Sequence, residues 1–100
     1  MDKYKVKLNS KAYRDINEIF KYIALEKLSP ENAQSQTTRI WEALKNLETF
    51  PHSHQKRTEG RYAEKDYRQL IIDNYIAIFK IDDNNKTVNI ITVQYQGRNI

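Results

Sequence analysis

The sequence predicts a single α+β domain with the element order β-α-α-β-β-β, in which a helical hairpin covers one face of an antiparallel sheet. Three observations predict it: apolar residues alternate over residues 3–8, recur at helical spacing between residues 10 and 47, and alternate again in three segments after residue 66. A chain of 100 residues can close only one hydrophobic core. Residues 1–100 are therefore expected to form one domain.

The first predicted element is a strand over Lys3–Leu8. Lysines occupy every second position there, and Tyr4, Val6 and Leu8 occupy the positions between them. Strict alternation places the apolar side chains on one face and the charged ones on the other, as in a half-buried strand. A lone strand ahead of two helices needs partners, which the later strands supply.

Two amphipathic helices are predicted next. The first begins with Ser10 as N-cap and ends near Glu26. The second begins at Ser29-Pro30-Glu31, where serine caps the helix, proline suits its first position and glutamate suits its positive end, and its apolar stripe continues to Leu47. The short link between the two helices predicts an antiparallel pair.

The remainder divides into an irregular connection and three strands. Residues 48–65 contain Phe50-Pro51, two histidines and Gly60 but no periodic apolar residues, which indicates a long loop. The strands are separated by the turn candidates Asp73-Asn74 and 82–86 and form an antiparallel meander. We expect them over Tyr67–Ile72, Tyr75–Ile81 and Val88–Tyr95.

Composition narrows the functional classes. Lysine and arginine outnumber aspartate and glutamate by 17 to 13, a small excess that favours polyanionic partners. The absence of cysteine excludes disulfides and thiolate metal ligands and suits a reducing cytosol, so we expect a cytoplasmic protein. The amino-terminal residues lack an apolar leader and no apolar run is long enough to span a bilayer, so no membrane association is expected.

Common catalytic motifs are missing from the sequence. It has no glycine-rich phosphate loop, no HExxH, no CxxC and no Gly-x-Ser-x-Gly, which argues against the usual nucleotide, metal and acyl-transfer enzymes. His52 and His54 alternate instead of lying one helical turn apart, so they are interpreted as solvated loop residues. We expect neither a metal nor a cofactor.

Basic residues gather in the long loop, where they are candidates for binding nucleic acid. They are interleaved with tyrosines that could stack on bases. Glu59, Glu64 and Asp66 dilute the cluster, so a solvated loop of mixed charge is an equally good interpretation. The candidates are Lys56, Arg57, Arg61 and Lys65.

Strand parity points to Arg68 and Tyr95 as candidate site residues. Arg68 shares a face with Leu70 and Ile72, and Tyr95 shares one with Val93 and Ile91. A charged side chain at the end of an apolar face either pairs locally or lines a pocket at the edge of the core. We expect the start of the second strand and the end of the last to border one basic hollow, although each residue could also be a simple edge residue.

Five segments resemble the RelE/ParE superfamily of toxins, in order along nearly the whole chain: YKVKLNSKAYRDINEIFKYI, SPENA, LETFP, YRQLIIDNYIAIFKID and VNIITVQYQGRNI. The resemblance implies the toxin half of a type II toxin-antitoxin module, of the kind that stabilises plasmids. It also implies growth arrest by the free toxin and an acidic antitoxin as its partner. A basic surface and open sheet edges would suit an acidic amphipathic segment that folds on binding.

The resemblance leaves three molecular functions open. RelE-like members cleave messenger RNA on the ribosome without a metal, ParE-like members inhibit DNA gyrase, and a degenerate member could be an inert antitoxin-binding module. The leading hypothesis is the ribosome-dependent endoribonuclease. By resemblance, Arg68 would then stabilise transition-state charge, and Tyr95 or Arg98 would assist proton transfer or bind phosphate.

Overall fold

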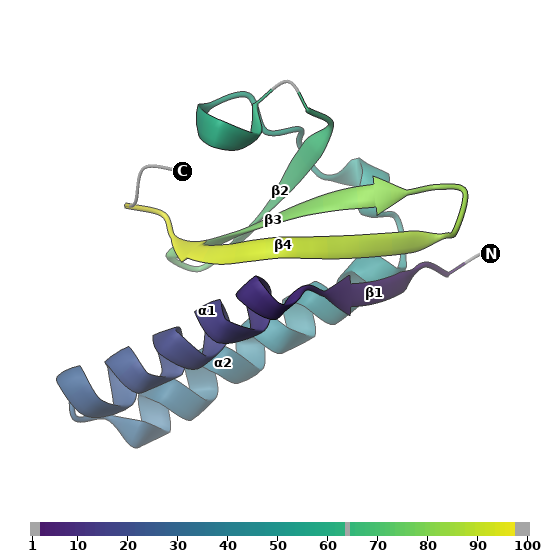
Figure 1. Cartoon of the computed structure of the whole chain (residues 1–100). Helices are drawn as coiled ribbons and strands as arrows, with labels where there is room; N and C mark the ends of the chain where they lie inside the picture. The colour runs from purple at the N-terminus through teal and green to yellow at the C-terminus, as the bar shows by residue number, and fades with distance from the viewer. Residues whose placement is uncertain (1–2, 64, 98–100) are drawn as a thin grey trace.

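The computed structural model, which describes residues 3–63 and 65–97, is a four-stranded sheet with two long helices packed side by side beneath it (Figure 1). This confirms the predicted α+β class and the β-α-α-β-β-β order of the principal elements. Short helical turns occupy the predicted loop. The principal elements are β1 (Lys5–Leu8), α1 (Ser10–Lys21), α2 (Pro30–Lys45), β2 (Tyr67–Ile72), β3 (Tyr75–Asp82) and β4 (Thr87–Tyr95).

The sheet is mixed rather than wholly antiparallel. Its strand order is β1-β4-β3-β2, and β2, β3 and β4 form the predicted antiparallel meander. β1 instead runs parallel to β4, with Lys5 opposite Thr87 and Leu8 opposite Ile90. A parallel pair requires a long crossover, and both helices lie within it. The last strand therefore lies between the first strand and the rest of the meander.

The helix ends follow local chemistry, with one change from prediction. The cap of α1 is Asn9, whose side-chain oxygen accepts the Ala12 amide, and Ser10 is already helical. At its far end α1 continues into a π-helical turn, η1 (Tyr22–Glu26). The chain then leaves through Leu28, which has a left-handed backbone (φ 52°), before Pro30 starts α2 as expected.

The core lies between the hairpin and the lower face of the sheet. Cross-strand partners share a face, so Arg68, Phe79 and Ile90 belong to this helix-covered face. Side chains of alternate parity belong to the opposite face. The buried apolar cluster combines Ala12, Ile16, Ile40, Leu44 and Leu47 with Ile72, Ala77, Phe79, Val88, Ile90 and Val93.

A bulge in β4 corrects the parity of that strand. Ile78 pairs with Thr92 but the next residue, Phe79, pairs with Ile90, so Ile91 is an extra residue. Because of it, Ile90 and Val93 both reach the core although they are three residues apart. Simple alternation would have placed them on opposite faces.

The loop between α2 and β2 is irregular, as expected, but it is well anchored. Its middle runs along the outer edge of β2, where the Arg57 amide donates to Tyr67 O (2.7 Å) and the Gln69 amide donates to Gln55 O (2.9 Å). Three single 3-10 turns, at Asn46–Glu48, Pro51–Ser53 and Gly60–Tyr62, compact the rest. Within the described residues, no helix combines the length and apolar character needed to cross a bilayer.

Candidate functional site

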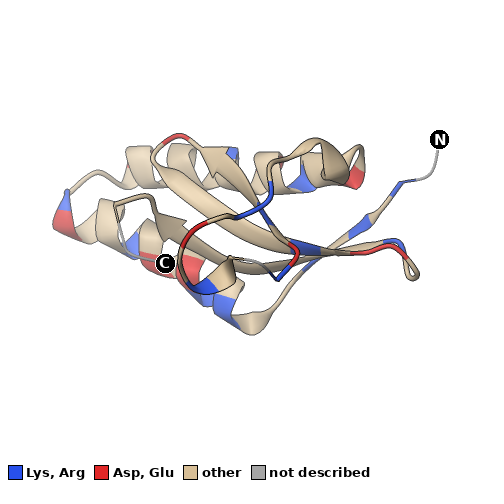
Figure 2. Cartoon of the chain, turned by 90° about the horizontal axis from the view of Figure 1, so that it is seen from above, with Lys and Arg blue, Asp and Glu red and all other residues tan. Residues whose placement is uncertain are grey.

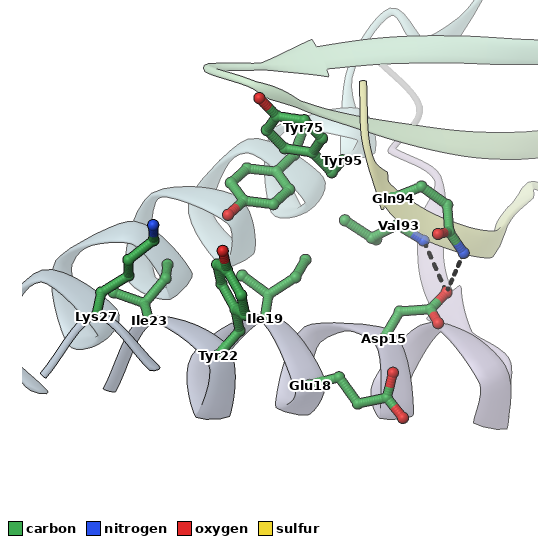
Figure 3. Close-up of a pocket in the computed structure, with 10 residues that line it drawn as sticks. All are labelled: Asp15, Glu18, Ile19, Tyr22, Ile23, Lys27, Tyr75, Val93, Gln94 and Tyr95. Atoms are coloured by element: carbon green, nitrogen blue, oxygen red, sulfur yellow. Dashed lines mark hydrogen bonds between the residues drawn. The ribbon is translucent and has the colours of Figure 1, made fainter. Parts of the chain in front are cut away.

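A cavity of about 550 Å³ opens where the end of α1 meets the start of β3 and the end of β4 (Figure 3). This volume lies in the range of ordinary ligand pockets. Apolar, aromatic and charged side chains all line it. The lining residues are Asp15, Glu18, Ile19, Tyr22, Ile23, Lys27, Tyr75, Val93, Gln94 and Tyr95.

Asp15 fixes one wall of the cavity by joining α1 to β4. β1 covers β4 only as far as Ile90, so the edge of β4 beyond that residue has no strand partner on this side. The Asp15 carboxylate occupies this edge and accepts the Val93 amide (3.1 Å) and the Thr92 hydroxyl. It also accepts Lys11 Nζ at 3.1 Å. The carboxylate therefore satisfies buried donors and blocks an open sheet edge.

Three tyrosines give the cavity its aromatic character. Tyr75 and Tyr95 are cross-strand neighbours whose rings meet edge to face at 5.9 Å, and Tyr22 faces them from η1 (Figure 3). Burial raises the pKa of Tyr75, and the neighbouring phenols of Tyr95 and Tyr22 raise it further. Its hydroxyl therefore remains protonated at neutral pH and can donate a hydrogen bond. Tyr22 and Tyr95 are both about half exposed and form the accessible rim.

Arg68 lies elsewhere, at the opposite end of the helix-covered face. Its guanidinium donates to the carbonyls of His52 (3.2 Å) and His54 (2.7 Å) and so fastens the loop beneath the sheet. The structure thus gives Arg68 the local-pairing role that strand parity left open. Any catalytic role for it stays a prediction.

The structure does not bring Arg68 and Tyr95 into a shared hollow. Both belong to the helix-covered face, but Arg68 aligns with Phe79 and Ile90, whereas Tyr95 aligns with Tyr75 and Ile72. In an antiparallel meander the start of the first strand neighbours the start of the third. The expectation that the start of β2 meets the end of β4 was therefore wrong, because the predicted meander already places these two points at opposite ends of the sheet.

The candidate cations of the loop lie at the surface, three of them exposed and Arg57 half-buried. Seen from above, basic and acidic residues alternate along the loop in front of the sheet (Figure 2). Lys56 pairs with Asp66 (3.5 Å), and Arg57 donates to Gln69 Oε1 (3.0 Å) and to a backbone carbonyl. Arg61 and Lys65 are exposed. Their role in binding nucleic acid stays a prediction, and Arg98 lies outside the described residues.

The two loop histidines are not both simply solvated. His52 contacts the Asp83 carboxylate (3.0 Å), whereas the His54 ring packs edge-on against Phe79 at 6.0 Å and is half-buried. Burial lowers the pKa of His54, and the Arg68 guanidinium lowers it further. Across the described ranges, no three metal-ligating side chains come together.

Sequence reasoning missed the tyrosine cavity. Tyr75 and Tyr95 could have been paired from strand parity only with the register known, and Tyr22 lies in a π-helical turn that no pattern predicts. The i,i+4 spacing of Lys11 and Asp15 was visible, but it suggests an ordinary surface ion pair.

The sequence matches a known protein family over nearly its whole length. Residues 6–100 match the family model described as the ParE toxin of the type II toxin-antitoxin system, parDE. No curated protein sequence matches the chain.

Solved structures share the fold at low sequence identity. The chromosomal ParDE toxin-antitoxin system of P. aeruginosa is 22% identical with a TM-score of 0.74, over 92% of this chain and 95% of that one. The RelBE2 complex of Mycobacterium tuberculosis is 22% identical with a TM-score of 0.65, over 98% and 97%. The archaeal RelE-RelB complex of Pyrococcus horikoshii is 16% identical with a TM-score of 0.64, over 96% and 98%.

Proposed function

This chain belongs to the ParE toxin family of type II toxin-antitoxin systems, and we propose that it arrests growth by inhibiting DNA gyrase rather than by cutting RNA. The family match over residues 6–100 supports this choice, because gyrase is the target that the resemblance implies for ParE-like members. The ribosome-dependent endoribonuclease remains the competing hypothesis.

One geometric observation carries the preference. Cleavage next to a ribose 2'-hydroxyl needs a base, an acid and a cation around one phosphate. Arg68 is fastened to two loop carbonyls at one end of the sheet, and Tyr95 packs on Tyr75 at the other. Within residues 3–63 and 65–97, the groups predicted for cleavage thus do not converge. An inhibitor that acts by binding needs no such convergence.

The test follows both targets in the same cells. The chain is expressed alone from a tightly controlled promoter, plasmid supercoiling is read on chloroquine gels, and message ends are mapped by primer extension. We expect supercoiling to fall while messages stay intact. Rapid cleavage at fixed codon positions with normal supercoiling would instead support the nuclease, and normal growth with neither change would indicate an inert antitoxin-binding module. Either result overturns the gyrase proposal.

We further propose that an acidic antitoxin segment occupies the tyrosine cavity. The matched structures from P. aeruginosa, M. tuberculosis and P. horikoshii are toxin-antitoxin systems or complexes, and the chain carries a net charge of +4 that complements an acidic partner. The cavity offers aromatic anchor sites in Tyr22 and Tyr95, and Lys27 stands at its rim. These are features of a groove that receives an amphipathic helix.

The antitoxin proposal has a matched control in Tyr13. Tyr22, Tyr95 and Tyr13 expose 52%, 53% and 51% of their surface, but Tyr13 lies outside the cavity, against Trp41. Truncating an anchoring aromatic residue weakens binding by about 1–2 kcal/mol or more, so Tyr22→Ala and Tyr95→Ala should each raise the Kd at least about fivefold. Tyr13→Ala should leave the Kd unchanged. An equal effect of all three substitutions in titration calorimetry would remove the cavity from the interface.

A further inference from the structure

A polar and aromatic row crosses the sheet on the face opposite the hairpin. Lys7 pairs with Asn89, Asn89 with Lys80, and Lys80 with Tyr67, so one residue from each strand lies on a single line. Directly paired residues share a face, and the strand neighbours of Lys7, Asn89 and Lys80 pack in or against the core on the other face. Adjacent strands lie about 4.8 Å apart, so the row extends across roughly 14 Å.

The side chains of this row are accessible and chemically mixed. Lys7 and Lys80 are exposed, and Asn89 and Tyr67 are half-buried. Lys80 Nζ lies 5.3 Å from the centre of the Tyr67 ring, and Tyr62 from the Gly60–Tyr62 turn meets that ring edge to face at 5.0 Å. The row thus runs from a cation through an amide and a second cation to an aromatic pair.

We propose that this row binds single-stranded nucleic acid. Lys7 and Lys80, two strands apart, would contact phosphates, Asn89 would offer an amide to a base edge, and Tyr67 and Tyr62 would provide stacking surfaces. Proteins that bind single strands combine a cationic track with aromatic platforms in this way, and stacking tolerates any base. A base that stacks on Tyr67 takes the place of Lys80 and releases its ammonium group for a phosphate.

Nearby carboxylates limit the affinity but do not neutralise the row. Asp82 and Asp83 line a cavity beside Lys80 and Asn89, and both are already engaged. Asp82 accepts hydrogen bonds from Asn85, and Asp83 accepts them from Tyr4 and contacts His52. These bonds lower the pKa of both acids, so they stay charged at neutral pH. Binding should therefore be modest and strongly dependent on salt.

The experiment uses the purified chain without gyrase. Fluorescence anisotropy measures the affinity for labelled oligo-dT and oligo-rU of about 12 nucleotides, and for a duplex of equal length, at several salt concentrations. Lys7→Ala and Lys80→Ala should each weaken binding several-fold and reduce the salt slope by about 0.7. Tyr67→Leu should weaken it at least about fivefold with the slope unchanged. Thermal melting checks that each variant is folded.

The matched control is Lys21→Ala, which removes an exposed lysine from the last turn of α1. It should change the affinity by less than about twofold. A loss equal to that of Lys80→Ala would mean that only overall charge matters, and would overturn the proposal. Preference for the duplex, or no binding by the unaltered chain at low salt, would overturn it as well. Comparison of oligo-dT with oligo-rU shows whether the row prefers single-stranded DNA or RNA. Because gyrase is absent from the assay, a lack of nucleic-acid binding would leave the gyrase proposal standing.

Discussion

Replacing Asp15 by alanine should cost this domain a large part of its stability. The change removes the acceptor shared by the Thr92 hydroxyl and the Val93 amide, and Thr92 is only 1% exposed. A buried donor left without a partner costs about 1–3 kcal/mol. The ion pair with Lys11, which is 43% exposed, adds at most about 0.5 kcal/mol, and the better helix propensity of alanine returns a similar amount.

The net loss is therefore about 2–3 kcal/mol of unfolding free energy. In a domain of this size it lowers Tm by roughly 10–20 °C. Urea denaturation followed by circular dichroism measures the loss directly. Glu18→Ala is the control, because it removes the same charge one turn further along α1 from an exposed side chain that lines the cavity (Figure 3).

A double-mutant cycle tests the mechanism behind this loss. Thr92→Val replaces the hydroxyl with a methyl group of similar shape. In the double variant with Asp15→Ala, the Thr92 hydroxyl is therefore absent and is not left buried without an acceptor. The unfolding free energy lost by the double variant should be smaller than the sum of the two single losses by at least about 1 kcal/mol. If Asp15→Ala lies within about 0.5 kcal/mol of the unaltered chain, water or a rearranged β4 edge satisfies these donors and the reasoning is refuted.

Three further predictions concern the loop and the hairpin. Arg68→Met should free the carbonyls of His52 and His54, so amide exchange over residues 55–57 should quicken and unfolding should cost about 1–2 kcal/mol less; unchanged exchange would contradict the fastening role. Because burial and Arg68 hold the pKa of His54 below its unfolded value of about 6.5, the unfolded chain binds a proton first, and stability should fall as pH drops below about 6.5. Denaturation at about pH 7.5 and 5.5 should show that the unfolding free energy of His54→Gln falls less between the two pH values than that of the unaltered chain. An equal fall in both proteins would exclude His54 as the cause. Leu28→Gly should raise stability by about 0.5–1 kcal/mol, because Leu28 is 84% exposed and has a left-handed backbone (φ 52°) that glycine adopts without strain; a lower Tm would show that its side chain contributes packing.

Most of the fold could be predicted because its signals are local. Alternation placed β2, β3 and β4 to within a residue, and Pro30 located the start of α2, since these patterns depend only on neighbouring residues. The cap of α1 was misplaced by one residue because asparagine and serine cap equally well and stand side by side. The parallel pairing of β1 and the extra residue Ile91 depend on contacts distant in sequence, and no local pattern reveals them.

The candidate site was harder to predict because it depends on register. Arg68 and Tyr95 lie on one face but at opposite ends of the meander, and the predicted strand order already implies this separation. In the sequence, Lys7 is one of three alternating lysines and Lys80 is an isolated one, so neither pointed to a shared site. Only the pairing of all four strands puts them in one row with Tyr67.

The position of β4 also determines when this toxin can become active. β1 has no strand to pair with until residues 87–90 have been made, because its neighbour is the strand that comes last in chain order. Such distant pairings are slow to form and cannot begin during most of translation. A product that stops short of Thr87 leaves both β1 and β3 with unsatisfied edges. Premature termination should therefore yield incompletely folded, aggregation-prone fragments.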